Sequence, residues 1–154
     1  MKIDIEEIVA LDELNMALII REAGGVFDPL WRKKKLFEEI GKGCRIMTNY
    51  IGGELAGYLQ YIQEDDDEVY ILSIQIHPKY RNGITLRALI KKSLREITPS
   101  SIKYITSSVH RNNTSVIKLH RKLGFLVFNE TKERVLFKLD LNKNTILGQV
   151  KADI

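Results

Sequence analysis

Apolar residues at helical spacing predict two helices in the N-terminal part of the chain. A stop signal, Gly24-Gly25, follows the first group, which consists of Leu11, Leu14, Leu18 and Ile19. Asp28-Pro29 then predicts an N-cap with proline at the first helical position, and this second helix ends at Gly41. The residues expected to face inward from it are Leu30, Phe37 and Ile40.

Alternating apolar and polar residues predict the strands of a sheet. Residues 44–51 and 55–63 flank Gly52-Gly53, which is typical of a hairpin. Residues 69–77 are apolar on one face and mixed on the other, as in a central strand, and residues 102–109 predict a further strand. Two antiparallel strands are expected to finish the sheet, at 125–128 and 135–141.

Two more helices are expected between these strands. The first follows the strand at 69–77 and shows an apolar stripe of Leu86, Leu89, Ile90, Leu94 and Ile97. The second spans 114–122, and Gly124 lies where a left-handed C-cap is expected. The resulting order, ααβββαβαββ, predicts an α+β (mixed α/β) fold with a central mixed sheet and helices on both faces. We expect one domain over residues 1–154, in which 142–154 form a flexible tail or a short edge piece.

Composition narrows the class of protein. Hydrophobic residues make up 44% of the 154 residues and charged residues 29%, which suits a packed core with a polar surface. The net charge of +4 arises from interspersed charges, so we do not expect a nucleic-acid-binding protein. Cys44 is the only cysteine, which fits a reducing compartment. No stretch approaches the ~20 apolar residues of a membrane span, and the acidic start is unlike a signal peptide. We expect a cytoplasmic protein.

Two segments carry the functional signal. Residues 74–83 run from a strand through a turn toward a helix, where unpaired N–H groups and the helix dipole favour a phosphate. Residues 113–125 form a second segment, in which Asn113, Leu119, Gly124 and Phe125 have a characteristic spacing. Together the two segments resemble the acetyl-CoA-binding motifs of the GNAT superfamily of N-acetyltransferases. The resemblance, including the element order, extends over nearly the whole chain.

The phosphate loop departs from the family pattern, which is Gln or Arg, two variable residues, Gly, one variable residue, then Gly or Ala. Aligned without a gap, Arg81 matches, but Ile84 and Leu86 replace the small residues. A loop shorter by one residue instead makes Gly83 the first glycine and places Thr85 at the last small position. Glycine lets the backbone approach phosphate closely, whereas a leucine side chain at that place would obstruct it. Both alignments stay open at this point.

The resemblance implies a set of site residues. The backbone of Ile74, Gln75 and Ile76 would contact the pantetheine arm of acetyl-CoA. The phosphates would rest on the loop made by Arg81, Asn82, Gly83, Ile84, Thr85 and Leu86. Asn113 opens the last core helix, either as an N-cap or also as a cofactor contact.

Two residues are candidates for proton transfer. His120 stands where the family has a tyrosine that protonates the departing CoA thiolate, and histidine can also donate a proton. The alternative for His120 is a partly exposed helix residue. Glu68 lies near the start of the strand that leads into the phosphate loop, where the family often places a general base. The alternative for Glu68 is a solvated turn carboxylate.

The sequence thus predicts an N-acetyltransferase that transfers an acetyl group from acetyl-CoA to a primary amine by direct attack in a ternary complex. No metal is expected. The acceptor is open between a small molecule and a protein amine, and a homodimer is one open oligomeric state. The alternative is a catalytically degenerate GNAT-like domain that acts as a binding or regulatory module. That alternative depends on whether Ile84 or Leu86 fills the space where pyrophosphate belongs.

Overall fold

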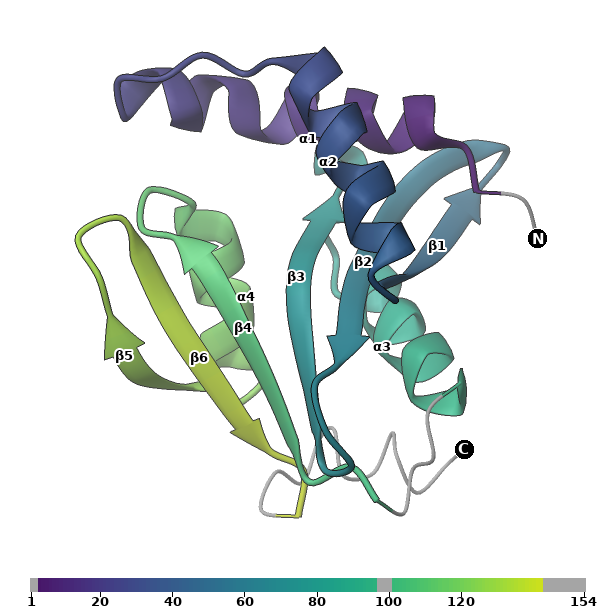
Figure 1. The fold of residues 1–154 in the computed structure, drawn as a ribbon, viewed down its shortest axis with the longest axis vertical. Helices are drawn as coiled ribbons and strands as arrows, with labels where there is room; N and C mark the ends of the chain where they lie inside the picture. Colours follow the sequence, from purple (N-terminus) through teal and green to yellow (C-terminus); the bar gives the residue numbers. More distant parts are fainter. Residues whose placement is uncertain (1–2, 97–100, 143–154) are drawn as a thin grey trace. The chain divides into compact units, whose positions relative to one another are not determined.

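A computed structural model describes residues 3–96 and 101–142 of the chain (Figure 1). Within these residues, four α-helices and six strands follow the predicted order, with a short 3₁₀ helix after the third strand. The helices are α1 (Ile5–Glu22), α2 (Pro29–Gly41), α3 (Ile84–Glu96), α4 (Thr114–Lys122) and the 3₁₀ turn η1 (Pro78–Tyr80). The strands are β1 (Arg45–Ile51), β2 (Glu54–Gln63), β3 (Glu68–Ile76), β4 (Tyr104–His110), β5 (Leu126–Glu130) and β6 (Arg134–Asp140). The tail expected at 142–154 lies, apart from Asn142, outside the described residues.

The strands form one mixed sheet in the hydrogen-bonded order β1-β2-β3-β4-β6-β5. Strands β3 and β4 pair in parallel, from Glu68 opposite Tyr104 to Ile71 opposite Ser107. Strand β6 is antiparallel both to β4 and to β5, whose register shifts between Val127 and Asn129. The expected α+β fold with a mixed sheet is therefore confirmed.

Residue contacts divide the chain into two compact units. The first contains Met1–Gln60 and Ile74–Ile90, and the second contains Tyr61–Ser73 and Lys91–Ile154. The expectation of a single domain over 1–154 stays a prediction.

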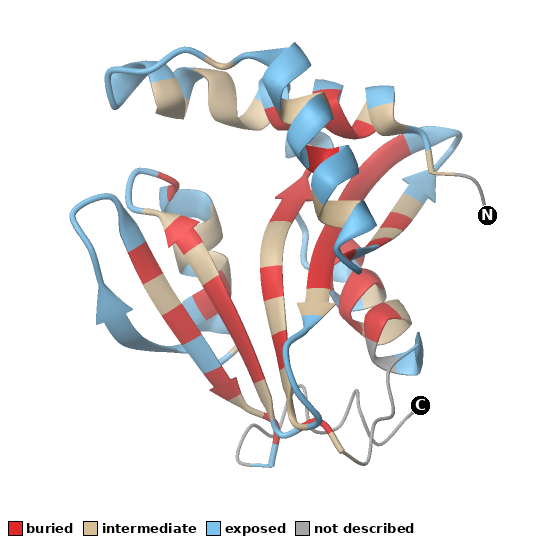
Figure 2. Ribbon diagram, in the orientation of Figure 1, coloured by how far each residue is buried: buried red, intermediate tan, exposed pale blue. Residues whose placement is uncertain are grey.

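The core of the first unit joins α1, α2, β1 and β2 (Figure 2). Its buried members are Ile8, Leu11, Leu36, Ile46, Leu55 and Tyr58. Aspartate caps begin both helices: Asp4 accepts from the amides of Glu6 and Glu7, and Asp28 accepts from those of Leu30 and Trp31. The N-cap predicted at Asp28, with Pro29 next, is confirmed.

The inward face of α2 differs from the prediction at two of three residues, since Ile40 packs against the core as expected. Leu30 and Phe37 are 80% and 55% exposed, whereas Leu36 is fully buried. Successive helical residues are about 100° apart, so the stripe through Leu36 leaves Phe37 on the flank. The residue one turn before Leu36 on the buried stripe is Arg32, which is held by buried partners described below. Because an arginine faces inward here, the pattern of hydrophobic residues does not predict which face of α2 is buried.

In the second unit, buried residues alternate along β6, whereas β4 buries the three consecutive residues 105–107, as Figure 2 shows. The buried side chains of β6 are Val135, Phe137 and Leu139, and Phe125 lies just before β5. Strand β5 itself is exposed at all five positions. Helix α4 contributes His120 as its buried residue, so an imidazole occupies a core position in this unit.

Candidate active site

In the first unit, the turn after β3 leads into the N-terminus of α3. The Nε atom of Arg81 donates to the carbonyl of Ile76 over 3.1 Å, and Oδ1 of Asn82 accepts from the amide of Ile84 over 3.1 Å. Gly83 lies between them with φ of +86°, a conformation that favours glycine. Within four consecutive residues, Arg81 bonds back to β3, Asn82 caps the helix and Gly83 makes the turn.

The side chains that replace the family's small residues leave the turn open. Leu86 is 2% exposed and belongs to the core, while Ile84 is 70% exposed. A Cβ at Gly83 would meet no heavy atom within 4 Å. Open space above the turn is what the close approach of a phosphate requires.

Unpaired donors gather at this helix start. The first amides of a helix have no carbonyl four residues earlier, and no hydrogen bond joins the amides of Thr85 and Leu86 to another described residue. The Thr85 hydroxyl is buried and also has no hydrogen-bond partner among the described residues. The helix dipole and the free amides together suit an anion.

The last residues of β3 are held by α1. Asn15 donates from Nδ2 to Gln75 Oε1 and to the carbonyl of Ile76, both over 3.0 Å. Ile74, Gln75 and Ile76, the predicted pantetheine contacts, are buried. Asn15 was not among the predicted site residues. The sequence feature that could have identified Asn15 is a side-chain amide four residues after Leu11, on the buried stripe of the first helix.

Gly57 of β2 is a second residue that the sequence analysis missed. A Cβ there would lie 2.9 Å from the carbonyl oxygen of Gln75 and 3.0 Å from Cγ2 of Thr85. The missing side chain lets three segments of the candidate cofactor site pack closely. An isolated glycine inside a strand pattern is the signal that marks such an approach.

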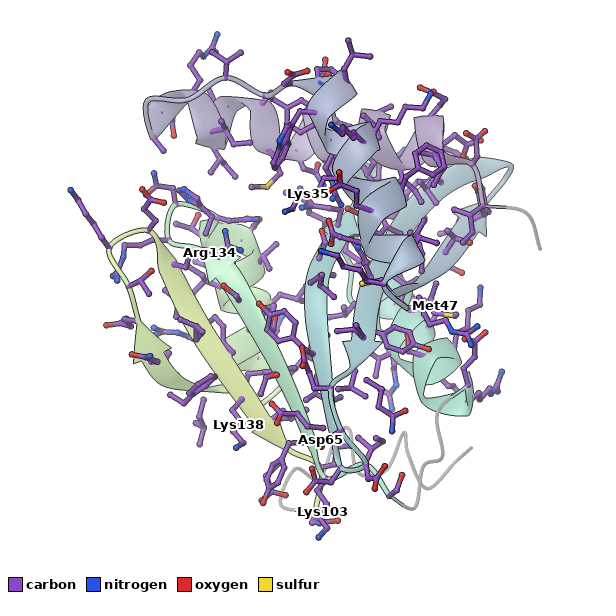
Figure 3. All side chains as sticks on the ribbon, in the orientation of Figure 1. Lys35, Met47, Asp65, Lys103, Arg134 and Lys138 are labelled. Atoms are coloured by element: carbon purple, nitrogen blue, oxygen red, sulfur yellow. The ribbon has the colours of Figure 1, made fainter. Side chains whose placement is uncertain are left out.

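In the second unit, Glu68 begins β3 and is half-buried. Its Oε1 accepts from the hydroxyl of Thr106 on β4 over 3.0 Å, and its amide donates to Oδ1 of Asp65 (labelled in Figure 3). The carboxylate is therefore fixed by a neighbouring strand rather than free in a turn.

His120 on α4 is 2% exposed and packs between two aromatic rings. The imidazole stacks on Phe137 and meets Phe125 edge-on, each with 4.8 Å between ring centroids. Nδ1 lies 2.8 Å from the Val116 carbonyl, and Nε2 lies 3.0 Å from the hydroxyl oxygen of Ser107. Burial lowers the pKa of His120 to about 4, so the ring is neutral near pH 7.

Asn113 is confirmed as the N-cap of α4. Its Oδ1 accepts from the amide of Val116 over 3.4 Å and from the hydroxyl of Ser115 over 3.3 Å. A cofactor contact by the same residue stays a prediction.

The structure brings the predicted residues into two groups. Arg81, with the loop through Leu86, lies at the end of β3 in the first unit. Glu68 and His120 belong to the second unit, where their partners Thr106 and Ser107 are adjacent on β4 and so point to opposite faces. Ser107 was missed, although its hydroxyl interrupts the otherwise apolar row of Ile105 and Val109.

The described residues offer neither a cluster of metal ligands nor a membrane-spanning helix. Within 3–96 and 101–142, no three His, Cys, Asp or Glu residues are placed to hold a metal ion. None of the helices in these ranges is long and apolar enough to cross a membrane.

Comparison with known proteins places the chain in a family. The sequence model described as "Acetyltransferase (GNAT) family" matches residues 15–125. A search of curated proteins gave no match.

Solved structures show the same fold. PaiA N-acetyltransferase from Thermoplasma acidophilum, in complex with coenzyme A, aligns with a TM-score of 0.66 and 17% identity over 91% of this chain and 96% of that one. An acetyltransferase from Thermus thermophilus aligns with a TM-score of 0.70 and 12% identity over 89% of this chain and 90% of that one. YncA from Salmonella typhimurium, solved with its cofactor acetyl-CoA, aligns with a TM-score of 0.60 and 19% identity over 94% of both chains. With the family match over most of its length, this chain belongs to the GNAT acetyltransferase family.

Proposed function

We propose that this protein is an N-acetyltransferase that transfers an acetyl group from acetyl-CoA to a primary amine by direct attack in a ternary complex. The observation that carries the proposal is the start of α3. There Leu86 is in the core, the space over Gly83 is open, and the buried Thr85 hydroxyl has no partner among the described residues.

The first unit supplies the proposed cofactor contacts. The amides of Thr85 and Leu86 would bind the pyrophosphate, with Arg81 and the turn at Asn82–Ile84 around it. Arg81 also holds the Ile76 carbonyl, so it links the phosphate turn to the strand whose residues 74–76 would contact pantetheine. Asn15 supports the same strand from α1. Acetyl-CoA would bring the activated acetyl group, and these residues would hold it in place.

Glu68 and His120 are the proposed proton-transfer groups. Glu68 would take a proton from the incoming ammonium group, because Thr106 holds its carboxylate by one oxygen and leaves the other for substrate or water. His120 stands at the place of the family's tyrosine, and to donate a proton to the leaving sulfur it would have to give up its bond to Ser107. The acceptor class, small molecule or protein amine, stays open.

The direct test is an acetyl-transfer assay. The purified chain would be incubated with acetyl-CoA and a panel of polyamines, amino acids, aminoglycosides and peptides with a free amine. Release of CoA thiol and a mass gain of one acetyl group on one acceptor class are the expected results. Tight acetyl-CoA binding without transfer to any amine would contradict the proposed activity.

Binding of acetyl-CoA without transfer would fit an alternative function, which a separate observation favours. Both ring nitrogens of His120 are engaged inside the second unit, so the imidazole has no free N–H to give to a sulfur. A GNAT-like module that binds acetyl-CoA and acts in binding or regulation would have this property. Transfer by the wild-type protein would exclude the alternative.

A further inference from the structure

A groove of about 480 Å³ lies in the first unit between α1 and the turn that joins β1 to β2 (Figure 1). Four residues of α1, residues 52–55 of the hairpin and His77 line it. The hairpin side is open, because a Cβ at Gly52 or Gly53 would meet nothing within 4 Å. The lining holds two carboxylates and one imidazole but no lysine or arginine, so its charge suits a cation rather than an anion.

One face of α1 forms the apolar wall of the groove. Ala10, Leu11 and Leu14 lie three, four and seven residues after Glu7, and this spacing brings side chains to the same face of a helix. Leu55 adds apolar surface from β2. Leu14 is 58% exposed, so more than half of it stands uncovered. A ligand with an apolar stem would be stabilised by removing this surface from water.

At the hairpin end of the groove, the charge of Glu54 already has partners. Its carboxylate accepts from the Tyr80 hydroxyl over 2.7 Å and lies 3.6 Å from Lys79 Nζ. Nδ1 of His77 accepts from the Lys79 amide, so the hydrogen of the neutral ring is on Nε2, which lies 3.5 Å from Glu54 Oε1. The cation, the hydroxyl and the imidazole together offset this carboxylate, and the end of the groove offers little charge to a ligand.

Glu7 is different, because its carboxylate has no counter-charge. The Tyr50 hydroxyl shares a hydrogen bond with it, and burial together with that bond raises the pKa of Tyr50 to about 12, so the phenol stays neutral. No ion pair joins Glu7 to another described residue. A half-buried carboxylate held only by a neutral donor favours a cation beside it.

We propose that this groove binds a primary amine with one charge and an apolar stem, with its ammonium group on Glu7 and its stem along Ala10 and Leu14. The ammonium would donate to the carboxylate oxygen that Tyr50 leaves free. The helix rises about 10 Å from residue 7 to residue 14, which accommodates an extended hexyl chain. A second charge at the far end of the stem would lose water against Leu14 without gaining a partner, so a diamine is disfavoured. The inference goes beyond acetyl transfer and does not depend on it.

Three probes that share one stem test the charge requirement: hexylamine, 1-hexanol and 1,6-diaminohexane. Each is titrated into the full chain without acetyl-CoA, and the amide resonances are followed by NMR. Hexylamine should bind with a Kd below about 1 mM and shift the amides of Ala10 and Gly53 most. Hexanol should bind at least about tenfold more weakly, because it lacks the charge-assisted bond to Glu7. Equal affinity for hexanol, or tighter binding of the diamine than of hexylamine, would overturn the proposal.

Two charge-removing variants of α1 then locate the site. Glu7→Gln keeps an acceptor for Tyr50 but loses the charge, so the Kd for hexylamine should rise about tenfold or more. Glu13→Gln is the matched control: it removes one charge from an exposed position of the same helix and should leave the Kd within about twofold. Leu14→Ser should weaken hexylamine by shortening the apolar wall. Equal Kd values for E7Q and E13Q, or no binding by the wild type at about 10 mM hexylamine, would overturn the assignment of the groove.

Discussion

Arg32 donates from Nε to Asp12 Oδ2 over 2.6 Å, which joins α2 to α1 by an ion pair inside the first unit. Asp12 is 3% exposed, and its second oxygen accepts from the Tyr58 hydroxyl. Arg32 also reaches Glu39 Oε1 at 3.2 Å and Gln60 Oε1 at 3.2 Å. Burial raises the pKa of Asp12, and Arg32 opposes that shift. The guanidinium of Arg32 and the carboxylate of Asp12 therefore each have hydrogen-bond partners, which offsets the cost of burying their charges.

Asp12→Ala should destabilise the protein by about 3–5 kcal/mol, because it leaves Arg32 charged and buried without its main partner. Urea unfolding at pH 7 measures the loss. The surface pair of Glu6 and Lys33 offers a control, in which Glu6→Ala should cost less than about 1 kcal/mol. Equal effects from the two alanine variants would show that the buried pair contributes no more than a surface one.

His120 predicts a loss of stability on acidification. Its pKa is about 4 in the folded protein and near 6.5 in the unfolded chain, so the unfolded chain binds more protons between these values. Stability is then fully present above about pH 6.5 and falls as the pH drops toward 4, by about 3 kcal/mol from this residue. Urea unfolding at pH 7, 5.5 and 4.5 measures the slope, and His120→Gln should flatten it. The same slope in both proteins would assign the loss to other groups.

Gly57→Ala should disturb the candidate cofactor site. The new Cβ would lie 2.9 Å from the Gln75 carbonyl, so β2 or β3 has to shift, at a cost of about 1–3 kcal/mol. Acetyl-CoA affinity should fall with it, since Thr85 is the other neighbour. Gly41→Ala is the control, because a Cβ at the end of α2 meets nothing within 4 Å and should leave both properties unchanged or raise stability slightly. Unchanged acetyl-CoA affinity in G57A would show that the close packing does not support the loop.

Glu68→Gln tests the proposed base. The amide keeps the bond to Thr106 but cannot take a proton, so the rate should fall roughly 100-fold, and most at low pH, where unprotonated amine is scarce. A pH–rate profile against the acceptor found for the wild type gives the result. Glu64→Gln changes a carboxylate of the same acidic turn and should match the wild type. A small, uniform loss in E68Q would return Glu68 to the role of a turn carboxylate.

The sequence predicted the elements well because their signals are local. The hairpin at Gly52-Gly53, for instance, has both glycines at positive φ, as a tight two-residue turn requires. The inward face of α2 was wrong because Arg32 occupies it, and a hydrophobic pattern counts an arginine as surface. Burial of a charge becomes visible only when its partners come together from α1 and β2.

The candidate site likewise combines features with a local sequence signal and features that depend on residues distant in sequence. By motif, the sequence predicted a phosphate loop from Arg81 to Leu86, a prediction that stays open, and it left two alignments open. In the structure Leu86 is in the core, and Gly83 takes the left-handed turn, which is the geometry that the shorter-loop alignment needs. Ser107, Asn15 and Gly57 depend on neighbours that are distant in sequence, so only the fold reveals their contacts.

The most direct test of the central claim is a calorimetric titration of acetyl-CoA into the wild-type protein, Gly83→Val and Gly43→Val. Both glycines have positive φ and open space where a Cβ would lie, so the two variants carry the same backbone strain, and only one is in the phosphate loop. We predict micromolar binding by the wild type, similar binding by G43V, and a loss of binding by G83V at an unchanged thermal midpoint relative to G43V. Wild-type affinity in G83V, or no binding by the wild type at millimolar acetyl-CoA, would contradict the assignment of this loop as the cofactor site.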